Sequence, residues 1–315
     1  MPSNLFPLGA LPARFRRPRV LIVGCGDVGL RAATALGAAR RRGPRLLALT
    51  SSPPRVPLLR ERGIQPLAGD LDAPATLRRL SGLATHVLHL APPAADAAVW
   101  WRDFRTVALL RALSTRTPPR ALVYGSTTGV YGDCGGAWVR ETRAVAPATP
   151  RAVRRVDAER AVRHFGRTSG ARAGILRIPG IYASDREGGT PRARLARGTP
   201  VLAAEDDVYT NHIHADDLAR ACVAALWRGR PQRVVNVCDH TALRLGDYMD
   251  FTADLYGLPR PPRIARAEAE RALPTTLLSF MGESRRLDNA RLARELRVPL
   301  LYPTVAEGLR AGMQG

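Results

Sequence analysis

The sequence predicts an α/β protein built on a doubly wound parallel sheet, followed by a smaller C-terminal lobe. Three observations support this fold class: short runs of Val, Leu and Ile alternate with longer helical patterns, those runs are continuously apolar, and the first ends in a glycine-rich turn. Continuous apolar runs are typical of strands buried on both faces of a sheet. Alternation of strands and helices at this spacing indicates repeated βαβ units.

Each apolar run predicts a strand, and each longer amphipathic pattern predicts a helix. The expected strands are Arg19–Val23, Arg45–Leu49, Ile64–Ala68, His86–Leu90, Ala121–Tyr124, Ala173–Ile178 and Val234–Val237. The expected helices are Val28–Arg42, Ala73–Leu80, Asp96–Ser114, Ala152–Phe165, Asp216–Trp227, Leu245–Tyr256 and Asn289–Leu296.

The order of these elements suggests three parts of the chain. Residues 1–18 contain four prolines, and their basic cluster follows the apolar stretch, which is the reverse of a secretory signal, so we expect a loose N-terminal arm. Residues 19–178 form the predicted nucleotide-binding domain. Residues 179–315 form the predicted substrate lobe, interleaved with a strand near 233–238 that returns to the sheet.

The charge of the chain is strongly positive, and all of it comes from arginine. The 315 residues carry a formal charge of +21, with 48 Lys plus Arg, and no lysine occurs in the sequence. The arginines are spread along the whole chain rather than clustered with aromatic residues, so we interpret them as a compositional bias and consider nucleic-acid binding unlikely. The resulting field nevertheless favours anionic ligands.

Cysteine spacing and hydropathy exclude several other classes of protein. The four cysteines contain no C-x-x-C pair, which argues against a metal site or a disulfide framework and fits a reducing cytoplasm. No apolar run approaches the roughly 20 residues of a membrane helix.

A G-x-G-x-x-G sequence at residues 24–29 follows the first expected strand and opens the first expected helix. Gly24 permits a tight turn, Gly26 lets the backbone approach a pyrophosphate, and Gly29 lets helix and strand pack closely. Together with Asp27 and Val28, these residues place free N–H groups at a helix N-terminus, where an anion binds well. This context predicts a Rossmann-type dinucleotide site.

The residues after the second strand bear on the choice between NAD and NADP. An acidic residue there usually holds the ribose 2′-hydroxyl of NAD. This chain instead has Thr50, Ser51, Ser52 and Arg55, and an arginine with hydroxyls suits the 2′-phosphate of NADP. We therefore expect NADP, with NAD as the second choice. Arg55 could instead merely begin a surface helix.

Two further strand ends could contact the cofactor. Asp70 and Leu71 follow the third strand, where Asp70 could bind the adenine edge or cap the following helix. Ala91 and Pro92 follow the fourth strand and would lie near the middle of the cofactor.

Four segments in order resemble the extended short-chain dehydrogenase/reductase superfamily, specifically its NAD-dependent epimerase/dehydratase family. They are Tyr124-Gly125-Ser126-Thr127-Thr128-Gly129-Val130-Tyr131-Gly132-Asp133, Leu176-Arg177-Ile178-Pro179-Gly180-Ile181-Tyr182, Asn211-His212-Ile213-His214-Ala215-Asp216-Asp217-Leu218-Ala219, and Ser284–Asn289 with Tyr302-Pro303-Thr304. The last pair resembles an atypical bacterial subgroup, and the likeness spans about residues 19–310.

This resemblance implies roles for several residues. Ser126 or Thr127 would hydrogen-bond the reacting hydroxyl or carbonyl, and Pro179 and Gly180 would touch the nicotinamide. The residues that would face the substrate are Tyr131, Ile181, Tyr182 and Asn211. Independently of the resemblance, His212 and His214 alternate on a short extended stretch, so one of them could point into the pocket, and His212 is the candidate.

The sequence departs from the family where the family uses a Tyr-x-x-x-Lys pair. Counting from Ala158-Glu159, Arg151 stands at the tyrosine position and Arg155 at the lysine position. Arg155 could still bind the ribose hydroxyls, but Arg151 cannot exchange a proton near neutral pH because guanidinium stays charged. A substitute could be Tyr131, His164, His212 or a water molecule bound to the substrate, and Tyr131 is the candidate we select.

These observations lead to two hypotheses of different classes. The first is an NAD(P)-dependent oxidoreductase or epimerase acting on a carbonyl or hydroxyl of a polar small molecule, with nucleotide sugars as one candidate class. The second is a cofactor-binding regulator or scaffold with impaired catalysis. A cytoplasmic homodimer is expected by analogy with the family.

Overall fold

The computed structural model describes residues 17–37, 43–94 and 99–313. Its centre is a seven-stranded sheet in the order β12-β7-β5-β4-β1-β2-β3, and every neighbouring pair is parallel. The strands are β1 (Arg19–Val23), β2 (Arg45–Thr50), β3 (Gln65–Ala68), β4 (His86–His89), β5 (Ala121–Thr127), β7 (Arg172–Ile178) and β12 (Arg233–Asn236). All seven expected strands are therefore present, and the doubly wound α/β fold is confirmed.

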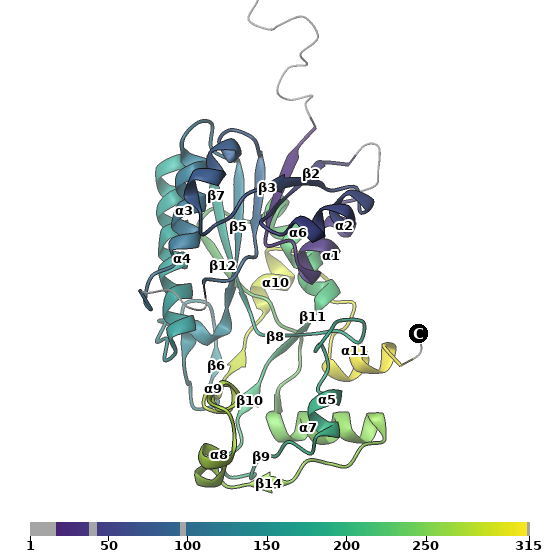
Figure 1. Ribbon diagram of the computed structural model, residues 1–315. Helices are drawn as coiled ribbons and strands as arrows, with labels where there is room; N and C mark the ends of the chain where they lie inside the picture. The colour runs from purple at the N-terminus through teal and green to yellow at the C-terminus, as the bar shows by residue number, and fades with distance from the viewer. Residues whose placement is uncertain (1–16, 38–42, 95–98, 314–315) are drawn as a thin grey trace, which may run out of the picture.

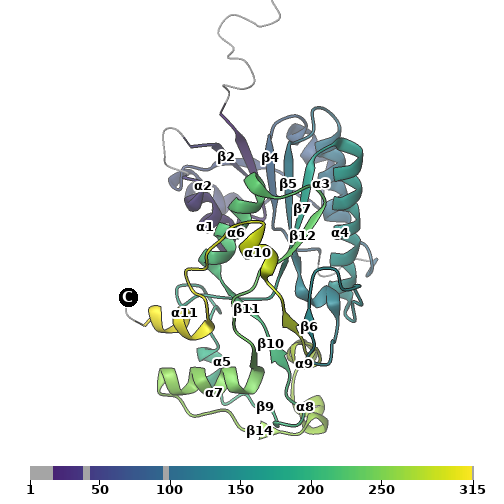
Figure 2. The ribbon, with the colours of Figure 1, turned by 180° about the vertical axis from the view of Figure 1, so that it is seen from behind.

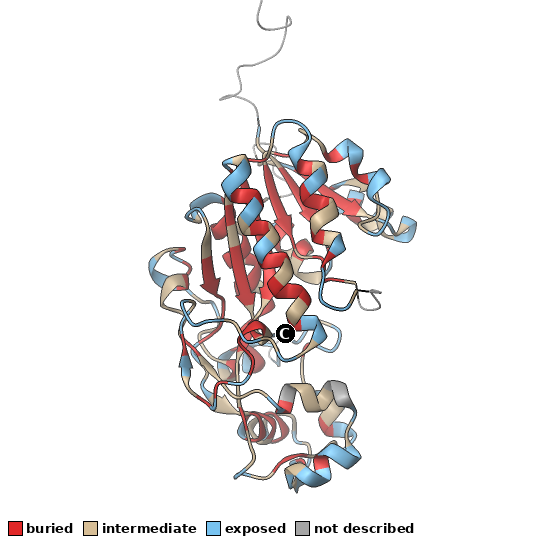
Figure 3. Cartoon of the chain, turned by 90° about the vertical axis from the view of Figure 1, so that its left-hand side faces the viewer, coloured by how far each residue is buried: buried red, intermediate tan, exposed pale blue. Residues whose placement is uncertain are grey.

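Helices cover both faces of this sheet (Figures 1 and 2). On one face pack α1 (Asp27–Ala35), α2 (Val56–Glu61), α6 (Ala215–Arg228) and α10 (Ala290–Arg294). On the other face pack α3 (Phe104–Ser114), α4 (Pro150–Ser169) and a 3-10 helix, η3 (Pro74–Leu80). The strands lie buried between the two layers (Figure 3), which explains why their sequences are continuously apolar.

The second lobe lies beyond the carboxyl ends of the strands (Figure 1). It is made of short helices and two-stranded pairs around its own core, which includes Tyr248, Met249 and Val305. Its helices are α5 (Arg192–Ala196), α7 (Leu245–Tyr256), α8 (Arg266–Ala272), α9 (Thr275–Met281) and α11 (Val305–Ala311). Its paired strands are β8 (Gly180–Tyr182) with β11 (His212–His214), β9 (Val201–Leu202) with β14 (Arg263–Ile264), and β10 (Tyr209–Thr210) with β13 (Leu243–Arg244).

Two connections join the lobe to the sheet. After the lobe begins at β8, the chain returns through α6 to β12, which pairs with β7 along Val234–Ile175 and Val235–Leu176. Farther along, β15 (Arg286–Leu287) pairs with β6 (Trp138–Val139), which belongs to the segment after β5. The C-terminal third therefore contacts the loop that follows the fifth strand.

The most marked differences from the predicted helices lie in three places. Helix α1 ends at Ala35, followed by Gly37 with φ +76°, and the expected continuation over 38–42 lies outside the described residues. Helix α3 begins at Phe104 because the Asp103 side chain accepts the Thr106 N–H as an N-cap, while 95–98 are also outside the described residues. The predicted helix over 73–80 is the 3-10 helix η3.

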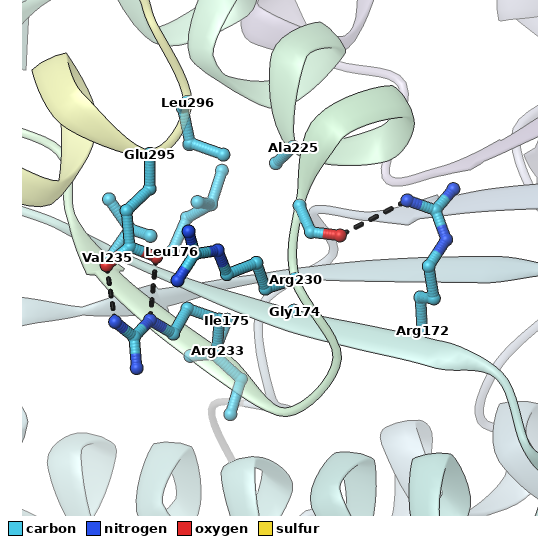
Figure 4. Close-up of a pocket in the computed structure, with 11 residues that line it drawn as sticks. Arg172, Gly174, Ile175, Leu176, Ala225, Arg230, Arg233, Val235, Glu295 and Leu296 are labelled. Atoms are coloured by element: carbon cyan, nitrogen blue, oxygen red, sulfur yellow. Dashed lines mark hydrogen bonds and ion pairs between the residues drawn. The ribbon is translucent and has the colours of Figure 1, made fainter.

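A small cavity lies at the β12 edge of the sheet (Figure 4). Its volume is about 10 Å³, which is room for little more than one water molecule. Two of the arginines around it have partners: Arg233 forms a two-point ion pair with Glu295, and Arg172 donates to the carbonyl oxygen of Gly229 over 3.2 Å. This cavity is a packing feature of the edge.

Candidate functional site

A cleft of about 450 Å³ opens at the carboxyl ends of the strands, between the sheet and the second lobe. Doubly wound folds bind their ligands at this edge. Polar side chains enter it from the end of β5, from the first turns of α4, from the segment after β7 and from the lobe. The residues used below that line it are Val28, Gly125, Ser126, Thr127, Gly129, Thr149, Arg151, Arg155, Pro179, Gly180, Ile181, Arg186, Tyr209, Asn211, Glu283 and Arg285.

The three glycines of the turn after β1 lie in different surroundings, and each position favours glycine for a different reason. Gly24 has φ +80°, and a Cβ there would lie 2.3 Å from the Ala91 nitrogen, so the fold itself requires glycine. At Gly29 a Cβ would lie 3.2 Å from the Gly24 oxygen, against the strand. Gly26 has φ −79°, and a Cβ there would meet no described atom within 4 Å. Glycine at position 26 leaves open space beside the N-terminus of α1, which fits a pyrophosphate.

Asp27 of the same turn is held by Arg31, which forms a hub by hydrogen-bonding three carboxylates. Arg31 donates to Asp27 over 3.1 Å and to Asp185 and Asp216 over 2.6 Å each. This hub ties the start of α1 to the loop after β8 and to α6. Val28 lines the cleft directly.

The loop after β2 contains no carboxylate between Thr50 and Arg55. Arg55 donates to the Cys25 carbonyl oxygen over 2.6 Å, so it bridges this loop to the glycine turn. Thr50 and Ser52 hydrogen-bond each other, and Ser51 is exposed.

Leu90, directly after β4, lines the cleft, whereas Asp70, Leu71, Ala91 and Pro92 lie outside its lining. The Asp70 carboxylate accepts the Asp72 N–H over 3.0 Å and so stabilises the turn before η3. It does not cap that helix, whose N-cap is Ala73 without a side-chain hydrogen bond, so the capping interpretation of Asp70 is wrong. Leu71 packs against the core on the α3 side, and Ala91 is buried against Gly24. The Pro92 carbonyl oxygen accepts from Arg105 over 3.3 Å.

The two hydroxyl candidates at the end of β5 are used differently. Ser126 donates to Glu159 over 2.7 Å, and Glu159 also forms a buried two-point ion pair with Arg177. The Thr127 oxygen accepts the Gly129 N–H over 3.3 Å, which leaves its hydrogen available to a ligand. Thr127 is therefore the better placed of the two to hydrogen-bond a substrate oxygen.

The structure places Tyr131 away from the cleft. Its side chain is 1 % exposed, its hydroxyl donates to Asn236 over 2.7 Å, and the Arg177 guanidinium lies 4.6 Å from its ring centre. Burial raises the pKa of Tyr131. These contacts correct the expectation that Tyr131 exchanges a proton with the substrate, because the hydroxyl is enclosed and already paired.

Two other expected substrate residues are also enclosed. Tyr182 is buried and donates to the Thr304 carbonyl oxygen over 3.2 Å, and His212 is buried with its ring 4.3 Å from that of Tyr248. Burial lowers the pKa of His212 to about 4. His164 is exposed on α4 and does not line the cleft. These positions correct the expectation that Tyr182, His212 or His164 reaches the substrate.

The segment after β7 and one amide do reach the cleft. Pro179, Gly180 and Ile181 line it, as expected. Asn211 also lines it, but its amide group donates to the Arg285 carbonyl oxygen over 2.9 Å and accepts the Leu287 N–H over 3.0 Å. Asn211 therefore holds the 285–287 segment in place.

The first turns of α4 present two arginines to the cleft. Thr149 caps the helix by accepting the Ala152 N–H, which sets Arg151 and Arg155 on one face, one turn apart. Arg155 is buried and donates through Nη1 to the Tyr124 hydroxyl over 2.9 Å and to the Gly125 carbonyl oxygen over 2.7 Å. Helix α4 itself contains no tyrosine.

Sequence reasoning missed the residues that the C-terminal segment contributes. Glu283 and Arg285 form an ion pair of 2.7 Å in the cleft, and Tyr209 from β10 lines it too. A Cβ on Gly129 would lie 3.7 Å from Thr127 Oγ1 and 3.8 Å from Glu283 Oε2, so the two oxygens flank one point. Glu283 is the sole carboxylate among the described lining residues. Its long sequence separation from Thr127 gave no local signal.

The described residues include neither a membrane-spanning helix nor a cluster of metal ligands. They contain no helix that is long and apolar enough to cross a membrane. The same residues contain no group of three or more His, Cys, Asp and Glu side chains arranged to hold a metal ion.

Comparison with known proteins identifies the family. The NAD dependent epimerase/dehydratase family matches residues 20–238. The chain belongs to this family. A functionally unknown conserved protein from Silicibacter pomeroyi is 29 % identical, with a TM-score of 0.78, covering 94 % of this chain and 98 % of that one. No curated protein matches the sequence.

More distant epimerase/dehydratase structures share the fold. A nucleoside-diphosphate-sugar epimerase from Pseudomonas aeruginosa is 20 % identical with a TM-score of 0.76, covering 95 % of this chain and 97 % of that one. A double mutant of DesIV, a dTDP-glucose 4,6-dehydratase from Streptomyces venezuelae with NAD bound, is 19 % identical with a TM-score of 0.75, covering 94 % and 96 %.

Proposed function

We propose that this protein is an NAD(P)-dependent oxidoreductase or epimerase that acts on a hydroxyl or carbonyl group of an anionic, polar substrate such as a nucleotide sugar. The observation that carries the proposal is the cleft, which joins the glycine turn to Thr127 and is lined by four arginines and one carboxylate among its described residues. Cationic walls favour a ligand that carries phosphate. The distant relatives named above act on nucleoside-diphosphate sugars, which supports this substrate class.

The cofactor would lie along the carboxyl edge of the sheet. Gly24, Gly26 and Gly29 with the N-terminus of α1 would hold its pyrophosphate, and Pro179 and Gly180 would contact its nicotinamide. A bound nicotinamide supplies or accepts a hydride. NADP remains our preferred cofactor because Arg55 and two serines replace the usual carboxylate after β2. The DesIV structure contains NAD, which keeps NAD as the alternative.

Thr127 and Glu283 would carry out the proton chemistry. Thr127 would donate its free hydrogen to the reacting oxygen of the substrate, and Glu283 would accept the proton that leaves a hydroxyl as it becomes a carbonyl. Arg285 would hold the Glu283 carboxylate in position through their 2.7 Å ion pair. Arg151 and Arg155 would remain cations throughout, because guanidinium does not release its proton in this pH range.

The second candidate function is a cofactor-binding regulator with impaired catalysis. The arginines at the first turns of α4, where relatives place tyrosine and lysine, favour it. In either case we propose a cytoplasmic protein that forms a homodimer. The two candidates differ in whether a nucleotide sugar is converted to an oxidised or epimerised product.

Titration with NADPH and NADH tests the cofactor assignment. We expect saturable binding with NADPH the tighter of the two, and a loss of about 100-fold or more in Gly26→Leu because the side chain fills the space left for the pyrophosphate. Unchanged affinity in Gly26→Leu contradicts the assigned site. An unchanged melting temperature in this variant shows that the fold is intact.

Turnover distinguishes the enzyme from the regulator. With NAD(P)+ and UDP-glucose we expect reduced cofactor or a 4-epimer to form, and Thr127→Val to slow it about 100-fold. Thr142→Val, an exposed threonine outside the cleft, is the matched control. Tight cofactor binding without turnover of any nucleotide sugar supports the regulator.

A further inference from the structure

We propose that Asp239 is a proton-controlled latch between the sheet and the second lobe, that is, a group whose protonation determines how firmly the lobe is held. The neutral carboxyl group keeps the junction together, and the ionised carboxylate loosens it. Asp239 lies outside the lining of the cleft. The inference therefore does not depend on the proposed function.

The loop after β12, residues 238–241, joins the sheet to the lobe. The Asp239 N–H donates to the His212 carbonyl oxygen of β11 over 2.8 Å. The Thr241 hydroxyl oxygen accepts the Val305 N–H over 2.9 Å at the start of α11. Because β12 belongs to the sheet whereas β11 and α11 belong to the lobe, this loop holds the two parts of the molecule together.

The Asp239 carboxyl group is buried within this junction and only half paired. The residue is 3 % exposed. Its Oδ1 accepts the Thr241 N–H over 2.9 Å, whereas its Oδ2 is buried and has no hydrogen-bond partner among the described residues. Burying a charged carboxylate with one oxygen unpaired is costly, and a proton on that oxygen removes the charge.

The charges that act most strongly on Asp239 are both negative. They are the carboxylates of Asp217 in α6 and Glu307 in α11, and Arg220 is engaged with the first of them over 3.0 Å. Burial first, and then these two charges, raise the pKa of Asp239 to about 7, although hydrogen bonds from Thr241 act in the opposite direction. Three elements therefore bring carboxyl groups to one junction.

The other titratable groups around the junction provide no buried cation. Burial raises the pKa of Tyr182 and of Tyr248, and the charge of Asp239 adds to both shifts. Burial lowers the pKa of His212 to about 4, so its imidazole is neutral near pH 7. His240 of the same loop is exposed, where solvent screens its charge. Within the described part of the chain, the ionised Asp239 carboxylate thus lacks a buried counter-ion.

The sign of the pH dependence follows from these surroundings. The pKa of Asp239 is about 7 in the folded chain and 3.8 without the fold, so the folded chain binds one more proton between these values. The resulting stability is complete below about pH 4, is lost as the pH rises to about 7, and changes no further above it. Separating the lobe from the sheet hydrates the carboxylate and relieves the repulsion, so ionisation favours opening at this junction.

Urea denaturation of the full chain between about pH 5.5 and 8.5 tests the proposal. Asp239→Asn keeps the shape of the side chain but cannot ionise. We expect the unfolding equilibrium constant of the wild type, relative to that of Asp239→Asn, to rise about tenfold from pH 5.5 to 6.5 and to level off above about pH 7.5. Asp247→Asn, an exposed carboxylate of the lobe helix α7, is the matched control and should keep the wild-type pH dependence.

Amide hydrogen exchange locates the opening. At about pH 7.5 we expect the amides of Asp239 and Val305 to exchange about tenfold faster in the wild type than in Asp239→Asn. This difference should appear while the amide of Leu21, in the buried strand β1, is still protected in both proteins. The opening is then local to the junction rather than global.

Glu307→Gln provides a second test that leaves Asp239 in place. Glutamine keeps the capping box that residue 307 forms with Thr304 but removes one of the two facing charges. The loss of stability should therefore end at a lower pH than in the wild type. This variant decides the matter if Asp239→Asn does not fold.

Four results would overturn the latch. They are the same pH dependence in the wild type and Asp239→Asn, an equal loss of pH dependence in Asp247→Asn, an unchanged pH range in Glu307→Gln, and equal protection of the junction amides in the wild type and Asp239→Asn. None of them bears on cofactor binding or turnover, so the proposed function stands or falls separately.

Discussion

Two of the arginine-lined cavities of this protein use the same residue type in different ways. At the β12 edge, Arg233 is neutralised by Glu295 and Arg172 is satisfied by carbonyl oxygens, around a space of about 10 Å³ (Figure 4). In the cleft of about 450 Å³, Arg151 and Arg155 line the wall, and the two hydrogen bonds printed for Arg155 go to an uncharged hydroxyl and a carbonyl oxygen rather than to a carboxylate.

The difference shows how to interpret an arginine-rich composition. Most of the positive charge of the chain could serve any folded surface, and its total says little about function. The interaction partners of each arginine distinguish a structural arginine from one that can bind a ligand. An arginine that already has a carboxylate stabilises the fold, whereas one that is held in a cleft without a carboxylate is available to a ligand.

The largest expected effect comes from removing a neutralised arginine. Arg177→Met leaves the buried Glu159 without its ion-pair partner, and we expect a loss of about 3–5 kcal/mol in the free energy of unfolding. Chemical denaturation measures it. The double variant Arg177→Met/Glu159→Gln should recover part of the loss, and no recovery would contradict the explanation by an unpaired charge.

The second effect contrasts two carboxylates that each hold an arginine. Glu283→Gln should lower turnover about 100-fold, because the amide cannot accept the substrate proton, with cofactor affinity unchanged. Glu295→Gln at the edge cavity is the matched control and should leave turnover as in the wild type. A similar rate in both variants would show that another group accepts the proton.

The third effect is the energy of the edge ion pair itself. Arg233→Gln removes an interaction in which the arginine side chain is 36 % exposed, so we expect a loss of about 1 kcal/mol or less. Denaturant titration at low and high salt measures this, and the difference from the wild type should shrink as salt rises. A loss as large as that of Arg177→Met would remove the distinction between exposed and buried pairs.

The smallest effect should have the opposite sign. Arg151→Gln removes one of two like charges at i,i+4 and should raise the free energy of unfolding by about 0.2–0.5 kcal/mol in the absence of ligand. A clear destabilisation of the ligand-free variant would mean that Arg151 already has a structural partner.

The sequence was a good guide where the signal is local. The seven strands, the turn at Gly24–Gly29 and the strand-end hydroxyls follow from patterns within a few residues. The surroundings of Tyr131 and His212 could not be predicted in this way, although both are neighbours in sequence of residues that line the cleft. Asn236 binds the Tyr131 hydroxyl and Tyr248 packs on His212, and both partners come from distant segments.

The same reason explains the residues that were missed. Glu283 reaches Thr127 only because β15 pairs with β6 and Asn211 holds the adjoining backbone. No pattern of period two or 3.6 records such an approach. The wall that the C-terminal segment contributes to the cleft therefore depends on long-range contacts of single side chains, which the sequence pattern does not record.

The return of the chain to the sheet at β12 has a consequence for how this molecule can be divided. A fragment that stops after β7 would lose its outermost strand and expose the hydrogen-bonding edge of β7, a surface that invites pairing with other copies. The lobe would lose the sheet and the β6 segment, to which its two connections, through β12 and β15, run. Evolutionary or engineered exchange of the lobe between homologues therefore has to carry β12 along with it, as an inserted cassette with two junctions rather than as a terminal appendage.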